Sequence, residues 1–222
     1  WDISMKDTKI CSIHEQGYDL LGIDFKTLEI LRRNDSYERE KPGWLSDNIV
    51  DAYLQMLTGS ALKTGKRIIS FSCPFYSSLE KAVRFRNVNK IYRILIKYYR
   101  NEIFESYDFI VFPINIGDQH WCVVVLDMWN QKIFYYDPLH TGATNLSVIS
   151  NIVVFLTMSS TARGRLAKFD CKKFVTDFAV CSESHFPLQT DGASCGVFIL
   201  LYVSNKIGLI SISCTKKTND AA

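Results

Sequence analysis

The chain has 222 residues, of which 47% are hydrophobic and 22% charged, a balance typical of a globular protein that excludes a disordered or fibrous chain. Lys and Arg number 26 against 23 Asp and Glu, too small an excess to indicate a nucleic-acid or membrane partner by itself. Seven cysteines without a C-x-x-C pair favour free thiols in a reducing compartment over disulfides or a zinc site.

The first half of the chain contains three predicted helices. Asp24 is a candidate cap for a helix that passes through Leu28 and Leu31. Ser46 or Asp47 is a candidate cap for a second helix, over residues 48–57. Residues 90–104 alternate apolar with basic side chains, which favours a helix with a solvated basic face.

The second half begins with a block of strands. Segments rich in Val, Ile, Phe and Tyr predict strands over 109–114, 121–127 and 132–136, and a short turn between the last two predicts a hairpin. A helix over 144–158 and a strand over 174–180 follow. Residues 196–203 are apolar all round, as in a buried helix. This order of elements predicts an α+β fold with an antiparallel sheet.

The predicted hairpin brings a histidine close to an aspartate. Antiparallel pairing returns His120 to the neighbourhood of residue 137 or 139, so that Asp137 falls on the neighbouring strand. A carboxylate in this position fixes the imidazole tautomer and stabilises the imidazolium, as in a catalytic triad. For this pair alone, a strand-end histidine beside an unrelated aspartate is the favoured interpretation, and a catalytic pair is the alternative.

Cys195 is the candidate nucleophile. It follows a polar, glycine-containing segment and begins the predicted buried helix, where the helix dipole and free N–H groups favour a thiolate. Backbone N–H groups there can also contribute to an oxyanion hole. Residues 192–196 match the G-x-S-x-G elbow of α/β-hydrolases as well, but no histidine follows them, which excludes that fold. For Cys73 and Cys122 we expect inert core thiols.

Four motifs in order resemble the ubiquitin-like-protein-specific cysteine proteases, the papain-like enzymes that process SUMO and related modifiers. They are GWLSDNIV at 43–50, FPIN at 112–115 followed by His120-Trp121, YYDPL at 135–139, and PLQTDGASCGVF at 187–198. The resemblance covers about residues 20–208. It implies that residues 1–222 form a single catalytic domain with a papain-like α+β fold, a central antiparallel or mixed sheet, flanking helices, and the nucleophile at the start of a buried helix.

The resemblance also implies roles for individual residues. Cys195 would be the nucleophile, and His120 would act as general base and then as general acid. Asp137 would orient His120, and Gln189 would donate a hydrogen bond to the oxyanion. A narrow tunnel under two tryptophans admits the Gly-Gly tail of the modifier, and the substrate-binding residues are Trp44, Asp47, Trp121 and Gly192. For Trp129, in the predicted turn, we expect ordinary core packing.

The implied activity is that of a thiol protease or isopeptidase, which cleaves after the C-terminal Gly-Gly of SUMO or a related modifier. We expect a monomer without metal or cofactor, without nucleic-acid or membrane partners, in the nucleus or cytoplasm (the host cytosol if it is a pathogen effector). Ser46, Asp191 and Ser194 replace the family's Asn, Asn and Asp, so SUMO, ubiquitin and the neddylation modifier remain open as substrates. An acetyltransferase of the same clan and a weakly active modifier-binding module are the alternatives.

Overall fold

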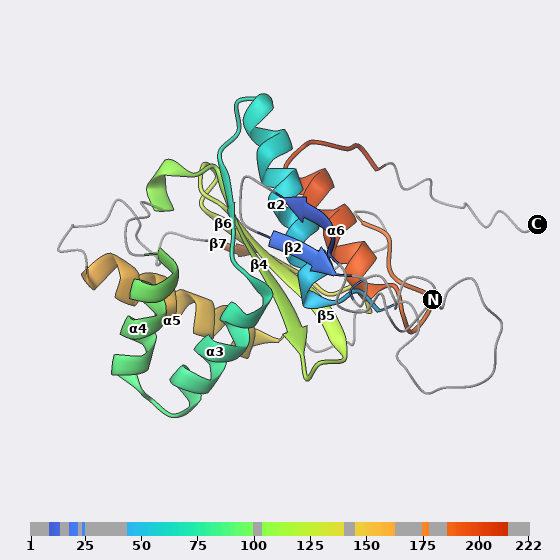
Figure 1. Cartoon of the computed structure of the whole chain (residues 1–222). Helices are drawn as coiled ribbons and strands as arrows, with labels where there is room; N and C mark the ends of the chain where they lie inside the picture. Colours follow the sequence, from blue (N-terminus) through green and yellow to red (C-terminus); the bar gives the residue numbers. More distant parts are fainter. Residues whose placement is uncertain are drawn as a thin grey trace, which may run out of the picture.

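The computed structural model describes residues 9–13, 18–21, 24, 44–99, 104–139, 145–162, 175–177 and 186–212. A five-stranded mixed sheet with the order β3-β4-β5-β6-β7 lies at its centre (Figure 1). The strands are β3 (Ile68–Ser70), β4 (Phe109–Ile116), β5 (His120–Asp127), β6 (Lys132–Tyr136) and β7 (Val175–Asp177). Strands β4, β5 and β6 pair antiparallel, whereas β3 and β7 add in parallel at the two edges.

Helices cover both faces of the sheet. Helices α2 (Asp47–Lys63) and α6 (Cys195–Lys206) lie on one side, and α3 (Cys73–Arg84), α4 (Val88–Tyr99) and α5 (Leu146–Ala162) lie on the other (Figure 1). A 3-10 turn, η3 (Phe104–Ser106), precedes β4, and a separate hairpin is formed by β1 (Lys9–Ile13) and β2 (Tyr18–Leu21). The predicted α+β architecture with flanking helices is therefore confirmed.

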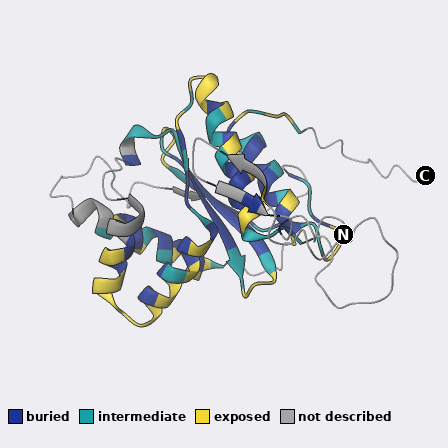
Figure 2. Cartoon of the chain, viewed as in Figure 1, coloured by how far each residue is buried: buried dark blue, intermediate teal, exposed yellow. Residues whose placement is uncertain are grey.

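Strand β5 shows why the sheet is buried on both faces. Side chains alternate along a strand, and Trp121, Val123 and Val125 belong to the hydrophobic cluster under α2 and α6. The residues between them, among them Cys122 and Val124, belong to the cluster under α3, α4 and α5. The central strands are accordingly buried, while the helices expose their outer faces (Figure 2).

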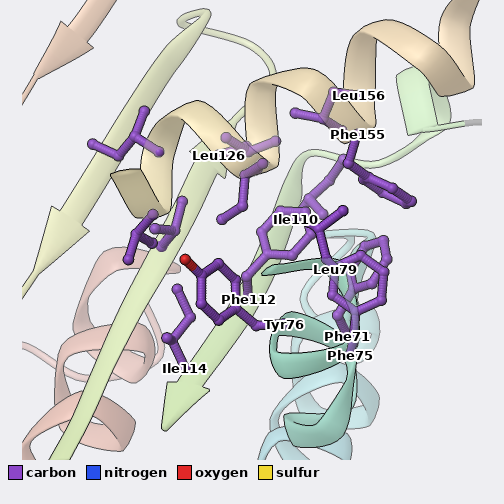
Figure 3. Close-up of a cluster of buried hydrophobic side chains, with 14 of the residues drawn as sticks. Phe71, Phe75, Tyr76, Leu79, Ile110, Phe112, Ile114, Leu126, Phe155 and Leu156 are labelled. Atoms are coloured by element: carbon purple, nitrogen blue, oxygen red, sulfur yellow. The ribbon is translucent and has the colours of Figure 1, made fainter. Parts of the chain in front are cut away.

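Several aromatic rings pack against one another in the cluster under α3 and α5 (Figure 3). Phe71 stacks on Phe112 with ring centroids 4.4 Å apart, and Phe155 meets Phe75 edge to face at 4.8 Å. All four side chains are essentially inaccessible to solvent. Offset and edge-to-face pairs of this kind add to the free energy gained from burial.

Helix α2 begins at a capped end that also supports the site. Ser46 is the N-cap, and its hydroxyl accepts a hydrogen bond from the Ile49 N–H at 3.3 Å. The buried Asp24 carboxylate accepts bonds from the Ser46 hydroxyl and from the Asn48 amide at 3.4 and 2.9 Å. The predicted cap is confirmed, while the helix predicted after Asp24 lies outside the described residues.

The remaining predicted elements are confirmed with shifted ends. The three central strands agree within two residues, and β6 agrees at both ends. The helix predicted over 90–104 ends at Tyr99, and α2 continues to Lys63, beyond the predicted end at Leu57. Elements β1, β2, β3 and α3 were not predicted. No helix among the described residues combines the length and apolar character needed to cross a bilayer.

The expectation for Trp129 is wrong. Its side chain is 87% exposed in the turn between β5 and β6. The turn is closed by Asp127, whose carboxylate accepts hydrogen bonds from the N–H and the side-chain amide of Asn130 at 2.9 and 2.7 Å. Trp129 stands at the tip of this closed turn, outside both hydrophobic clusters.

Candidate active site

His120 and Asp137 meet where β5 begins and β6 has just ended. The register pairs Val123 with Tyr136, and its extension puts Asp137 opposite Cys122, two residues from His120 and on the same face of the sheet. Nε2 of His120 lies 2.7 Å from Oδ1 of Asp137, and the two side chains are 17% and 12% exposed. The hairpin therefore brings these two residues together as its spacing predicts.

Further hydrogen bonds hold the Asp137 carboxylate in place. Oδ1 accepts a bond from the Leu139 N–H at 3.0 Å, and Oδ2 accepts one from the Tyr135 hydroxyl at 3.5 Å. Burial raises the pKa of Asp137, but the bond to His120 and its charge outweigh burial, so that the net pKa is lowered. The carboxylate is therefore ionised at neutral pH.

His120 has a strongly shifted pKa. Burial lowers the pKa of His120. The hydrogen bonds to Asp137 and Cys195, together with the charges of these residues, outweigh burial and raise the pKa to about 9. Because Nε2 faces Asp137, Nδ1 is the ring nitrogen left for the thiol. An imidazolium is thus favoured beside Cys195 at neutral pH.

Cys195 is the first residue of α6 and is only 2% exposed. Its position at a helix N-terminus places it beside main-chain N–H groups that lack intrahelical partners. The next residue, Gly196, packs closely on the segment before α2, since an added Cβ would lie 3.0 Å from the Cβ of Leu45. This contact fixes the start of α6 against the start of α2. Cys73 and Cys122 are buried free thiols whose pKa is raised by burial, as expected of core cysteines.

Gln189 is joined to both sides of the site. Its N–H donates to the Pro138 carbonyl at 2.9 Å, immediately after Asp137. Its side-chain amide donates to the Asp191 carbonyl, four residues before Cys195. Oε1 of Gln189 is buried and has no hydrogen-bond partner among the described residues. Gln189 therefore lies between the orienting and the nucleophilic halves of the site.

The two tryptophans of the motifs occupy different environments. Nε1 of Trp44 donates to the Gly192 carbonyl at 3.2 Å, at a partly exposed position across from the turn that precedes Cys195. Trp121 is 2% exposed and donates to the Leu45 carbonyl at 3.1 Å. The buried Trp121 thus holds the segment that carries Trp44 through this hydrogen bond to Leu45.

Asp47, the first residue of α2, is half-buried near β4. Its Oδ1 accepts a hydrogen bond from the Asn115 amide at 3.4 Å. Burial raises the pKa of Asp47, an effect that the bond to Asn115 opposes. Asn115 Oδ1 is itself buried without a partner in the described part of the chain. These groups form a polar edge able to receive a donor group.

Three contributors to the site were not singled out from the sequence. Tyr135 bonds to Asp137, and Tyr136 donates from its hydroxyl to the Pro187 carbonyl at 2.8 Å, which fixes the segment that leads to Gln189. Leu45 contacts both Gly196 and Trp121. Both tyrosines stand in the YYDPL motif, so the period-2 alternation of a strand ending just before Asp137 offered a signal for them.

Comparisons with known proteins identify a family for this chain. Residues 43–206 match the family model described as the Ulp1 protease family, C-terminal catalytic domain. A sentrin-specific protease of Caenorhabditis elegans is 29% identical over 160 residues, which cover 70% of this chain and 20% of the worm protein. Ubiquitin-like-specific protease 1 of Saccharomyces cerevisiae is 24% identical over 180 residues, which cover 80% of this chain and 24% of the yeast protein. The chain spans about a fifth to a half of the length of the curated relatives it matches.

Solved structures show the same fold. A de-sumoylating protease superposes with a TM-score of 0.67 at 20% identity, covering 90% of this chain and 71% of the other. The C-terminal Ulp1 protease domain in complex with Smt3, the yeast ortholog of SUMO, superposes with a TM-score of 0.58 at 20% identity. The match covers 86% of this chain and 74% of the Ulp1 domain. The papain-like fold expected from the motifs is therefore confirmed.

Proposed function

The chain belongs to the Ulp1 protease family, and on this premise we propose that it is a cysteine peptidase that cleaves after the C-terminal Gly-Gly of SUMO or a related ubiquitin-like modifier. The observation that carries the proposal is the convergence of Cys195, His120 and Asp137 at one end of the sheet, with the raised pKa of His120. The reaction releases a modifier from a lysine or trims its precursor.

The first half-reaction forms a thioester. Sγ of Cys195 attacks the carbonyl carbon of the terminal glycine, and the carbonyl oxygen becomes an oxyanion. The Cys195 N–H and one hydrogen of the Gln189 amide stabilise that oxyanion. The C–N bond breaks as the His120 imidazolium gives its proton to the leaving amine. Asp137 keeps the imidazole ring aligned throughout.

The second half-reaction is hydrolysis. Neutral His120 removes a proton from water, and the resulting hydroxide attacks the thioester carbonyl. The tetrahedral intermediate expels the Cys195 thiolate and releases the modifier's C-terminal carboxylic acid, which loses its proton to solvent. His120 keeps the proton that it took from water, so the thiolate and the imidazolium are both restored for the next turnover.

Substrate selection follows from the residues around the nucleophile. We place the Gly-Gly tail in a tunnel bounded by Trp44 and Gly192, with the buried Trp121 as its inner wall. Glycines fit such a space because a Cβ would collide with the indole rings. Asp47 then receives a basic side chain of the modifier, since its carboxylate stands at the edge of the site.

The proposal extends to the whole chain. The sheet and helices described from residue 44 to residue 212 support one catalytic domain, which we assign to residues 1–222. We further propose that it acts as a monomer on conjugates in the nucleus or cytoplasm. A reducing compartment of this kind suits the free cysteines at 73, 122 and 195.

The test is hydrolysis of C-terminal fluorogenic amides of SUMO, the neddylation modifier and ubiquitin. We expect turnover with SUMO first, and a loss of at least about 1,000-fold in kcat for Cys195→Ala. Cys73→Ala is a matched control because Cys73 is also buried and also begins a helix, but its thiol donates to the Asp47 carbonyl rather than to a histidine. It should retain full activity.

Each other outcome separates the alternatives. Turnover that survives Cys195→Ala would refute the proposed nucleophile. Binding of a modifier without hydrolysis would indicate a binding module, and acetyl transfer from acetyl-CoA without cleavage would indicate an acetyltransferase. Hydrolysis of ubiquitin or the neddylation modifier alone would retain the thiol peptidase and overturn SUMO as its substrate.

A further inference from the structure

Asp191 collects an unusual number of hydrogen bonds for an exposed residue. Its Oδ1 accepts from the N–H groups of Ala193 and Ser194, both at 2.7 Å, and its Oδ2 accepts from the Ser194 hydroxyl at 2.7 Å. The Gln189 amide donates to the Asp191 main-chain carbonyl and lies 3.4 Å from Oδ1. One residue thus ties the turn before Cys195 to the side chain of Gln189.

These bonds decide which donors face the reacting carbonyl. The N–H groups of Ala193 and Ser194 are used by Asp191, whereas the Cys195 N–H has no acceptor among the described residues. The first N–H groups of a helix lack intrahelical partners, so the Cys195 N–H remains for an oxyanion. A primary amide has two hydrogens, and the bond from Gln189 to Asp191 leaves the second one for the same task.

We propose that Asp191 is a positioning residue, which builds the oxyanion hole by holding the Gln189 amide and the turn that ends at the Cys195 N–H. The inference rests on the proposed peptidase function and deepens it. Trp44 supports the same turn from the other side through its bond to the Gly192 carbonyl. The turn is therefore held at three consecutive residues after Asp191.

The ionised carboxylate suits this task better than other side chains do. Hydrogen bonds from the Ser194 hydroxyl and from the N–H groups of Ala193 and Ser194 lower the pKa of Asp191, so its carboxylate accepts these three donors as an anion at neutral pH. Asparagine retains one acceptor oxygen for the two N–H groups but presents a donor to Ser194. Alanine removes all side-chain acceptors. Asp191→Asn should thus be milder than Asp191→Ala.

The position also explains a departure from the family pattern. The motif of the family has an amide at position 191 and an acid at 194, whereas this chain has an acid and a hydroxyl. In this chain the Ser194 hydroxyl donates to the Asp191 carboxylate. The double change Asp191→Asn with Ser194→Asp restores the residue types of the family motif and again places one donor side chain opposite one carboxylate acceptor.

The experiment is steady-state hydrolysis of a SUMO fluorogenic amide at saturating substrate. Removal of one oxyanion donor costs about 100- to 1,000-fold in kcat, so we expect about 10- to 100-fold for Asp191→Ala with an unchanged KM. Asp191→Asn should lose about 3- to 10-fold, and the double change Asp191→Asn with Ser194→Asp should recover to within about 3-fold of wild type. Asp127→Ala is the matched control, because Asp127 closes a turn in the same way at the far end of the hairpin.

Coupling to Gln189 distinguishes positioning from general stability. If Asp191 acts through Gln189, the double variant Asp191→Ala with Gln189→Ala should lose little more activity than Gln189→Ala alone. Multiplied losses, or a kcat within twofold of wild type for Asp191→Ala, would overturn the proposal. So would an equal loss in Asp127→Ala at equal folded fraction. If Asp191→Ala does not fold, Asp191→Asn replaces it in the double-variant comparison with Gln189→Ala, and the same outcomes support or overturn the proposal. An inactive wild type would instead refute the proposed peptidase function.

Discussion

At the level of single residues, the proposed mechanism depends on the protonation state of His120. Its pKa of about 9 exceeds the ordinary value of about 6.5 for histidine, so the imidazolium persists through neutral pH. The raised pKa results from the hydrogen bonds and charges of Asp137 and Cys195, which outweigh burial. An enzyme that needs this imidazolium loses activity as the pH rises through about 9.

Asp137→Asn tests this dependence. The change removes the carboxylate that raises the pKa of His120 and leaves the burial that lowers it. We therefore expect the alkaline limb of kcat/KM to move from about 9 down toward about 6.5. We also expect activity at pH 8 to fall by about 100-fold or more. An unchanged alkaline limb, measured between pH 5 and 10, would contradict the role of Asp137.

Single residues also show what the sequence could and could not predict. The meeting of His120 and Asp137 was predictable because one short turn sets their register. The burial of Trp121 was not, because its indole bonds to the carbonyl of Leu45, 76 positions earlier. The orientation of Gln189 toward Asp191 was equally hidden, since local side-chain bonds to the main chain leave no periodic pattern.

The packing of α6 on the segment before α2 is the critical contact between elements. Gly196 faces three Leu45 side-chain atoms, whose distances from an added Cβ would be 3.0 to 3.1 Å. Leu45 is 8% exposed and stands between Trp44 and the N-cap Ser46, so it has little freedom to move. The glycine is needed here for close approach and not for an unusual backbone angle.

Gly196→Ala should destabilise the protein by about 1–2 kcal/mol, because overpacking outweighs the better helix propensity of alanine. Gly59→Ala is the matched control, since no atom lies within 4 Å of its added Cβ in the middle of α2. It should stabilise the protein by about 0.5–1 kcal/mol. Urea denaturation measures both. Equal stabilisation by the two substitutions would show that Leu45 does not constrain α6.

The elements differ in how far the sequence revealed them. Strands β5 and β6 are rich in β-branched and aromatic residues and are joined by a short turn, so the local sequence pattern was sufficient to predict both strands. Helix α3 was missed although Pro74 stands in its first turn and Phe75, Leu79 and Ala82 follow at helical spacing. Strand β3 has three residues and is defined by its pairing with β4, which no local pattern reveals.

The fold of the whole molecule brings the proposed catalytic groups together from three elements. Antiparallel pairing places the start of β5 and the end of β6 at the same end of the sheet, and α6 begins there as well. Cys195 belongs to the cluster under α2 and α6, whereas Cys122 and Tyr135, beside the His120–Asp137 pair, belong to the opposite cluster. The proposed triad therefore draws its residues from both sides of the sheet. The order of motifs predicted this meeting, but its geometry depends on long-range packing.

Covalent capture tests the central claim most directly. The probe is SUMO with an electrophile in place of its terminal glycine carboxylate, and the readout is intact mass followed by peptide mapping. The account predicts one adduct per chain on Cys195, none on Cys73 or Cys122, and none in Cys195→Ala. No adduct with the wild type, or an adduct that persists in Cys195→Ala, would contradict it.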